Sequence, residues 1–134
     1  MQGLWINNEF VDSSTDEMLE VIDPATEEVI ETVQAAGPPD VDRAVRAAHA
    51  AFPAWRRLPA VERAALLREV ADRLRARREE LAVLLTRETG RTLRKNRGYV
   101  DFSADTFGFF AELARNERGR VIASPEASQL SLVL

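Results

Sequence analysis

Residues 31–52, ETVQAAGPPDVDRAVRAAHAAF, contain the change in hydrophobic periodicity that decides the fold class. Up to this stretch, apolar and polar side chains alternate, which is typical of half-buried strands. Gly37-Pro38-Pro39 interrupts the alternation, and after it apolar residues recur at the three- and four-residue spacing of a helix. We expect Asp40 to be the N-cap of this helix and Pro53 to end it. The sequence therefore predicts strands followed by helices, an α+β fold.

Two β-hairpins are predicted within residues 1–36. The first pairs residues 4–6 with 10–11 around Asn7-Asn8-Glu9, because asparagine tolerates the positive φ of a tight turn. The second has the turn Asp23-Pro24-Ala25-Thr26-Glu27, where proline presets φ and Asp23 can accept a hydrogen bond from the backbone ahead. We expect the two hairpins to form one small antiparallel sheet.

About four helices are predicted over residues 40–118. We expect Pro59 to be the first residue of the second helix, and Gly90 to follow the end of the third in a left-handed conformation. The fourth helix is predicted from about Leu93 to Arg118, with Gly119 closing it.

The last segment, residues 128–134 or SQLSLVL, has the alternation of a strand, with apolar residues at 130, 132 and 134. A strand that stops on Leu132-Val133-Leu134 is expected either in a truncated chain or in a terminal strand docked into a sheet. The sequence leaves both interpretations open.

The composition is that of a single globular domain, and it excludes several kinds of site. The 134 residues carry 18 basic and 22 acidic side chains, a net charge of −4, and 46% are hydrophobic. The absence of cysteine excludes disulfides, thiolate metal sites and a thiol nucleophile. The single histidine, His49, excludes a site with several histidine ligands. We therefore predict no metal site in this chain.

Charge and hydropathy also bear on partners and compartment. The net charge of −4 disfavours nucleic acid and anionic membranes as general partners. No run approaches the ~18 apolar residues of a membrane span. The first 30 residues lack the basic segment followed by an apolar core that makes a signal peptide. We expect a cytoplasmic protein that binds neither nucleic acid nor membrane.

The residues by themselves predict no catalytic or cofactor-binding site. No two glycines have the spacing of a dinucleotide fingerprint, and there is no Gly-Lys-Ser/Thr phosphate loop. Asp101 and Asp105 share a helical face and His49 lies on another helix, but solvated helix surfaces explain these residues better than acid–base chemistry. Residues 63–97 hold 11 basic and five acidic side chains. Their interleaving at i, i+4 spacing favours exposed helix faces over a nucleic-acid surface.

Particular residues resemble the NAD(P)-dependent aldehyde dehydrogenase superfamily. Residues 5–11, WINNEFV, are similar to its Trp-Ile-Asn-Gly-Glu-Phe-Val opening, and residues 23–30, DPATEEVI, to its Asn-Pro-Ala-Thr-Gly-Glu-Val-Ile turn. Glu88-Thr89-Gly90-Arg91 stands where members often have Glu-Thr-Gly-Lys. Further matches follow in the family's order, among them Asp40-Val41-Asp42-Arg43-Ala44-Val45, Glu62-Arg63-Ala64 and Glu80-Leu81-Ala82.

The resemblance implies that residues 1–134 are the N-terminal part of a Rossmann-like cofactor-binding domain. Hairpins would occupy 1–36, helices 40–118 and a truncated strand 128–134. The family's catalytic cysteine, general-base glutamate, oxyanion-hole asparagine and glycine-containing cofactor loop lie further along its chains, so we expect this chain to be inactive alone. The resemblance implies that the full-length enzyme binds NAD or NADP, and that this chain alone binds no cofactor.

The same resemblance implies partners and leaves alternatives. The remainder of the polypeptide or a homologous subunit would be the partner, in a homo-oligomer. The stripes at Leu67/Leu74 and Phe107/Ala111 would then pack on strands outside this chain. A stand-alone assembly module that docks through strand 128–134 is the alternative, and a helical nucleic-acid binder using Arg73 to Arg97 is a third.

The sequence departs from the family pattern in a few places. Asn8 replaces the glycine of the first turn, and Asp23 replaces the asparagine of the second. Family members often hold a structural monovalent cation between a carbonyl, here that of Ile22, and an acidic residue of the fourth helix. Tyr99 stands at that acidic position, so no cation site is predicted.

Overall fold

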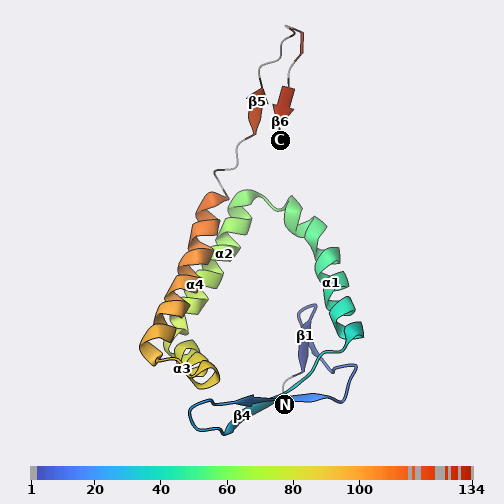
Figure 1. Ribbon diagram of the computed structural model, residues 1–134. Coiled ribbons are helices and arrows are strands. Elements are labelled where there is room, and N and C mark those ends of the chain that lie inside the picture. Colours follow the sequence, from blue (N-terminus) through green and yellow to red (C-terminus); the bar gives the residue numbers. More distant parts are fainter. Residues whose placement is uncertain are drawn as a thin grey trace.

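The computed structural model describes residues 3–114, 116, 119–122, 126, 128, 129 and 131–133. Its elements are strands β1 (Leu4–Ile6), β2 (Glu9–Val11), β3 (Met18–Ile22) and β4 (Val29–Gln34), helices α1 (Pro38–Arg57), α2 (Ala60–Ala76), α3 (Arg78–Thr89) and α4 (Leu93–Leu113), and strands β5 (Arg120–Ile122) and β6 (Ser131–Val133). Hairpins come first, then the helices, and the β5–β6 hairpin extends away from the helices (Figure 1). The predicted α+β class is confirmed.

The N-terminal hairpins have the predicted turns but do not share one sheet. Asn7 and Asn8 have φ values of 54° and 63°, as a two-residue turn between β1 and β2 requires. The β1–β2 and β3–β4 pairs are separate two-stranded antiparallel sheets, so the expectation of a single sheet was wrong. Side chains of the connecting residues bind elsewhere: Thr15 Oγ1 donates to the carbonyl of Ala35 at 3.1 Å. The connection is therefore held at the end of β4 and does not extend the β1–β2 ladder.

Both predicted boundaries of the first helix were wrong. Gly37 is the N-cap of α1, and Pro38 and Pro39 are its first residues, where a missing N–H costs nothing. Asp40 is the third helical residue and not the cap. Pro53 lies inside the helix, which continues to Arg57. Pro53 leaves the carbonyl four residues earlier without its helical donor, and water can replace that donor because this face of α1 is exposed.

The other helix ends agree with the prediction in part. Pro59 was predicted to be the first helical residue of α2. It is the N-cap instead, so the helix begins one residue later, at Ala60. Gly90 follows α3 with φ 67°, as predicted. Helix α4 ends at Leu113, so it is shorter than expected, and Arg118 lies outside the described residues. The sequence after Ala114, RNER, offers no apolar side chain that would continue the buried stripe.

The helical core is made mainly of alanines. Helices α2 and α4 lie side by side, with α3 packed at one end (Figure 1). Fully or almost fully buried alanines lie on all three helices, namely Ala64, Ala71, Ala82, Ala104 and Ala111. Small side chains let helices approach closely. Ala111 therefore lies in the core of this chain, contrary to the expectation that it packs on an outside strand.

The C-terminal segment pairs within the chain. Strand β6 is antiparallel to β5, with Val121 opposite Leu132. A strand was predicted over 128–134, and this is confirmed for residues 131–133, while apolar positions 130 and 134 lie outside the described residues. Strand β5 was not predicted.

A matched pair of glycine substitutions tests the turn after α3. Gly90 has a positive φ, and a Cβ there would lie 2.9 Å from Cγ of Pro24. Gly98 is inside α4, and a Cβ there would have no neighbour within 4 Å. We expect Gly90→Ala to destabilise the chain by about 1–2 kcal/mol and Gly98→Ala to stabilise it by about 0.5–1 kcal/mol. Urea unfolding of the two variants measures both, and equal effects would contradict the assigned role of Gly90.

Candidate functional site

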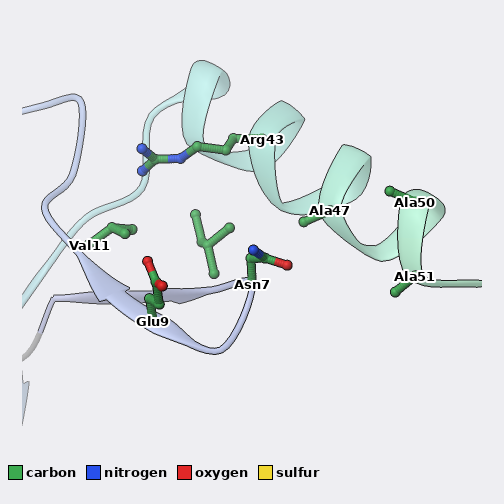
Figure 2. A pocket seen from close by; sticks show the side chains of 8 residues that line it. Asn7, Glu9, Val11, Arg43, Ala47, Ala50 and Ala51 are labelled. Carbon is green, nitrogen blue, oxygen red and sulfur yellow. The ribbon is translucent and has the colours of Figure 1, made fainter.

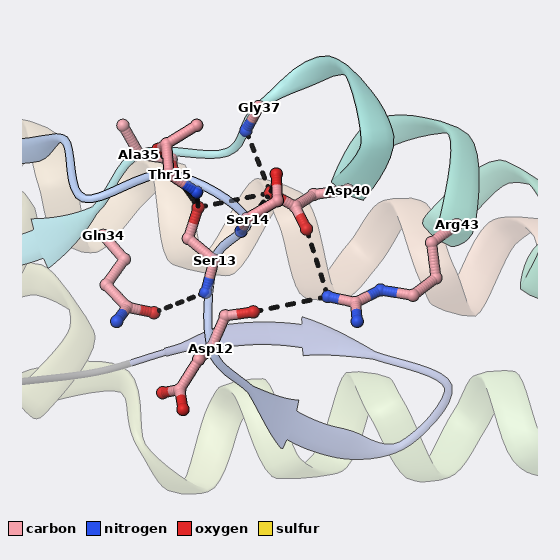
Figure 3. Close-up of polar contacts among 9 residues, drawn as sticks. All are labelled: Asp12, Ser13, Ser14, Thr15, Gln34, Ala35, Gly37, Asp40 and Arg43. Carbon is pink, nitrogen blue, oxygen red and sulfur yellow. Dashed lines mark hydrogen bonds and ion pairs between the residues drawn. The ribbon is translucent and has the colours of Figure 1, made fainter.

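The densest polar cluster surrounds the carboxylate of Asp40, which is 3% exposed (Figure 3). Oδ2 accepts hydrogen bonds from the hydroxyl and backbone N–H of Ser14 at 2.7 and 2.9 Å. It also accepts from the backbone N–H of Gly37 at 3.0 Å and the hydroxyl of Ser13 at 3.2 Å. Nη2 of Arg43 binds Oδ1 at 3.1 Å. One carboxylate thus joins the β2–β3 connection to the first turn of α1.

These hydrogen bonds keep Asp40 ionised. The backbone N–H of Ser14, followed by its hydroxyl, lowers the Asp40 pKa from 3.8 to about 2, despite the opposing effect of burial. A general acid or base works best with a pKa near the operating pH. The cluster is therefore a structural anchor at neutral pH and not an acid–base centre.

The same geometry bears on whether this chain could hold NAD. Dinucleotide pyrophosphates bind at helix N-termini through free backbone N–H groups that follow a glycine-rich turn. At the start of α1, Pro38 and Pro39 have no N–H, and the Asp40 carboxylate already accepts the N–H of Gly37. This helix start repels a phosphate, and the chain has no glycine fingerprint elsewhere. The residues present do not fit NAD by themselves.

An open hollow of about 590 Å³ lies between the β1–β2 hairpin and α1 (Figure 2). Glu9 and Arg43 are its charged groups, and its lining is otherwise asparagine and aliphatic side chains: Ile6, Asn7, Val11, Ala47, Ala50 and Ala51. The Glu9 carboxylate is the one lining group that could act as a base or a nucleophile, and no second catalytic group lines the hollow beside it.

The acidic residues weighed as an acid–base pair bind different arginines. Nε and Nη2 of Arg78 donate to the two carboxylate oxygens of Asp101 at 2.7 and 2.8 Å. This contact lowers the pKa of Asp101. Nη2 of Arg75 donates to Asp105 at 3.0 Å. His49 lies on the exposed surface of α1. The structure therefore gives these groups helix-packing and surface roles.

Ion pairs among the helices engage five of the 11 basic side chains in residues 63–97. These join Arg73 to Glu69, Arg75 to Asp72 and Asp105, Arg77 to Glu80, Arg78 to Glu79 and Asp101, and Arg97 to Glu79. The exposed pairs each add little stability, and they compensate part of the local positive charge.

Tyr99 binds an arginine at the place where the family often has an acid. Nη1 of Arg91 donates to the Tyr99 hydroxyl at 2.7 Å, and the guanidinium lies 5.2 Å from the ring centroid.

Within the described residues, no three His, Cys, Asp or Glu side chains are grouped so that they could hold a metal ion. No helix in the described part of the chain is long and apolar enough to cross a membrane.

The fold corresponds to part of the aldehyde dehydrogenase fold. A family model described as "Aldehyde dehydrogenase family" matches residues 10–134. The chain therefore belongs to the aldehyde dehydrogenase family, as the resemblance of its short motifs indicated.

Solved structures agree over nearly the whole chain. A point mutant of betaine aldehyde dehydrogenase from Staphylococcus aureus, in complex with NAD+, is 34% identical and has a TM-score of 0.92; the match covers 98% of this chain and 27% of that one. PnpE in complex with nicotinamide adenine dinucleotide is 40% identical, with a TM-score of 0.90 and coverage of 97% and 27%. Lactaldehyde dehydrogenase from Escherichia coli is 34% identical, with a TM-score of 0.88 and coverage of 93% and 26%. The chain spans only about a quarter of the length of these enzymes.

Proposed function

We propose that residues 1–134 form the N-terminal part of the cofactor-binding domain of an NAD(P)-dependent aldehyde dehydrogenase. The whole enzyme would oxidise an aldehyde to a carboxylic acid, and this part would be its scaffold, inactive alone. The observation that carries the proposal is a TM-score of 0.92 with an NAD+-bound enzyme over 98% of this chain but 27% of that one. Within this part, the hairpins lie in residues 1–36, the helices run from Pro38 to Leu113, and we propose that the segment 128–134 is a strand that continues into the rest of the enzyme.

The chemistry of the described residues supports a scaffold role. Aldehyde oxidation through a thiohemiacetal needs a thiol nucleophile, and this chain has no cysteine. Its most buried carboxylate, Asp40, is committed to holding the β2–β3 connection on α1. The partner would be the remainder of the dehydrogenase polypeptide or a homologous subunit, in a cytoplasmic homo-oligomer.

A chimera with the Staphylococcus aureus enzyme tests this proposal. Residues 1–134 replace the matched segment of that enzyme, and NADH formation is followed with betaine aldehyde. We expect the chimera to reduce NAD+ and the isolated chain to reduce none. The control is a chimera whose catalytic cysteine is changed to alanine. A folded chimera that neither binds NAD+ nor reduces it would overturn the proposal, as would aldehyde-dependent NADH formation by the isolated chain.

The native mass gives an independent answer that does not depend on folding of the chimera. We expect the protein in its source cell to have an intact mass several times the 15.0 kDa of these residues. A native mass near 15.0 kDa would contradict the proposal and favour a stand-alone module that docks on a partner.

A further inference from the structure

Helix α4 carries two apolar stripes, and only one of them is used within this chain. The first contains Val100, Ala104 and Ala111, which are 4%, 0% and 0% exposed where α4 packs on the other helices. The second follows the three- and four-residue spacing 99, 102, 106, 109, 113 on another side of the helix, and it is apolar except at Thr106, whose hydroxyl donates to the carbonyl of Phe102. Its large members, with Phe110 beside them, are all exposed: Tyr99, Phe102, Phe109, Phe110 and Leu113. We call these five side chains the aromatic face.

The aromatic face is too apolar for a helix side that stays in water. Phe102 is 70% exposed, and Phe109 and Phe110 are each 56% exposed. The rings of Phe109 and Phe110 meet edge to face, with centroids 5.5 Å apart. None of the five side chains is an Asp, Glu, Lys or Arg. Contiguous exposed aromatic residues of this kind mark interaction sites, whereas single exposed apolar residues do not.

Hollows adjoin the aromatic face toward both ends of α4. Tyr99 lines one of about 370 Å³, whose other lining is mostly aliphatic but includes a carboxylate and a hydroxyl: Leu74, Leu81, Leu84, Leu85, Glu88, Val100 and Ser103. Phe110 and Leu113 line another of about 370 Å³, next to Arg63 and Asn116. Two of the three acids on α4 are bound to arginines, Asp101 to Arg78 and Asp105 to Arg75. The five side chains of the aromatic face therefore fit an apolar partner surface, and the charged groups Arg63 and Glu88 lie at the two hollows beside it.

We propose that the aromatic face is the surface on which the rest of the aldehyde dehydrogenase polypeptide docks. This inference rests on the proposed function and adds the surface through which the scaffold is covered. The share of each chain that is matched indicates what covers this face. The betaine aldehyde dehydrogenase structure matches 98% of this chain, but this match takes in only 27% of the enzyme's own chain. That additional polypeptide is available to cover α4 in the relatives, whereas the described residues supply no cover for this face.

The absence of cysteine makes the docking face directly measurable. Phe102→Cys and Phe109→Cys each introduce a single thiol, and its reaction with a maleimide is read by mass on the 15.0 kDa chain. The partner is the Staphylococcus aureus enzyme without its matched segment, co-expressed as a separate chain. We expect complex formation to slow labelling at both positions at least about tenfold, since burial blocks access to the thiol. Val83→Cys on α3, which is 46% exposed, is the control and should label at an unchanged rate.

A second measurement covers the case in which the two chains do not assemble. In the chimera, Phe102→Ser together with Phe109→Ser should lower the melting temperature, while Val83→Ser should not. Unchanged labelling in a formed complex, or an unchanged melting temperature in an active chimera, overturns the docking face and leaves the proposed function standing. Protection of Phe102→Cys by raised concentration of the isolated chain alone would assign the face to a second copy and also overturn the inference. An inactive, folded chimera would overturn the proposed function itself.

Discussion

Ala64→Leu is expected to lower the melting temperature of the chain by roughly 5–10 °C, because overpacking a helix contact typically costs about 1–3 kcal/mol. Ala64 on α2 has no exposed surface, and Ala104 and Ala111 on α4 have none either. The two helices pack side by side. A leucine at position 64 would have to push them apart or leave its preferred rotamers. Thermal unfolding followed by far-UV circular dichroism measures the change.

Ala65→Leu is the matched control for this prediction. Ala65 is the next residue on the same helix and is exposed, so the added methylene groups meet solvent. Its melting temperature should stay within about 2 °C of the parent, because alanine and leucine have similar helix propensities. If both variants had the same melting temperature as the parent, the inference that α2 and α4 approach closely at Ala64 would be wrong.

Local features were predictable where a single residue carries the requirement. The turn at Asn7 and Asn8 and the end of α3 at Gly90 both need a positive φ, which asparagine and glycine adopt at little cost. The resemblance also indicated the family correctly, because the order of short motifs over the whole chain is more specific than any one of them.

Features that depend on distant contacts were not predictable in this way. The sequence suggested Asp40 as a helix cap, but its partners Ser13 and Ser14 lie 27 and 26 residues away. The predicted stripe of α4 included Ala111 beside Phe107, but periodicity did not show that the alanine would be fully buried and the larger Phe107 partly exposed. The separation of the two hairpin sheets likewise depends on side-chain hydrogen bonds of the β2–β3 connection, which periodicity does not encode.

The candidate site shows the same division. The absence of cysteine and of a glycine fingerprint could be read from the sequence itself. The predicted stripe of α4 ran through Phe107 and Ala111, and the aromatic face, with Phe102 and Phe109, was not predicted. The repeated spacing 99, 102, 106, 109, 113 was the available signal. It becomes meaningful only once the other stripe is known to be buried.

Asp40→Asn is expected to lower the melting temperature by roughly 5–10 °C at pH 7. The Asp40 carboxylate only accepts hydrogen bonds, whereas the asparagine amide would place an NH2 donor next to other donors. The effect should depend on pH. Hydrogen bonds from Ser14 lower the folded-state pKa of Asp40 from 3.8 to about 2, so its stabilisation is complete above the unfolded pKa and is lost as pH falls through the folded one. The difference in melting temperature between parent and variant should therefore hold at about pH 5–7 and vanish between about pH 4 and 2.

Asp42→Asn, on the same turn but 56% exposed, is the control. A difference that persisted below the folded-state pKa, or an equal effect of both variants, would show that the Asp40 carboxylate does not anchor α1 to the β2–β3 connection.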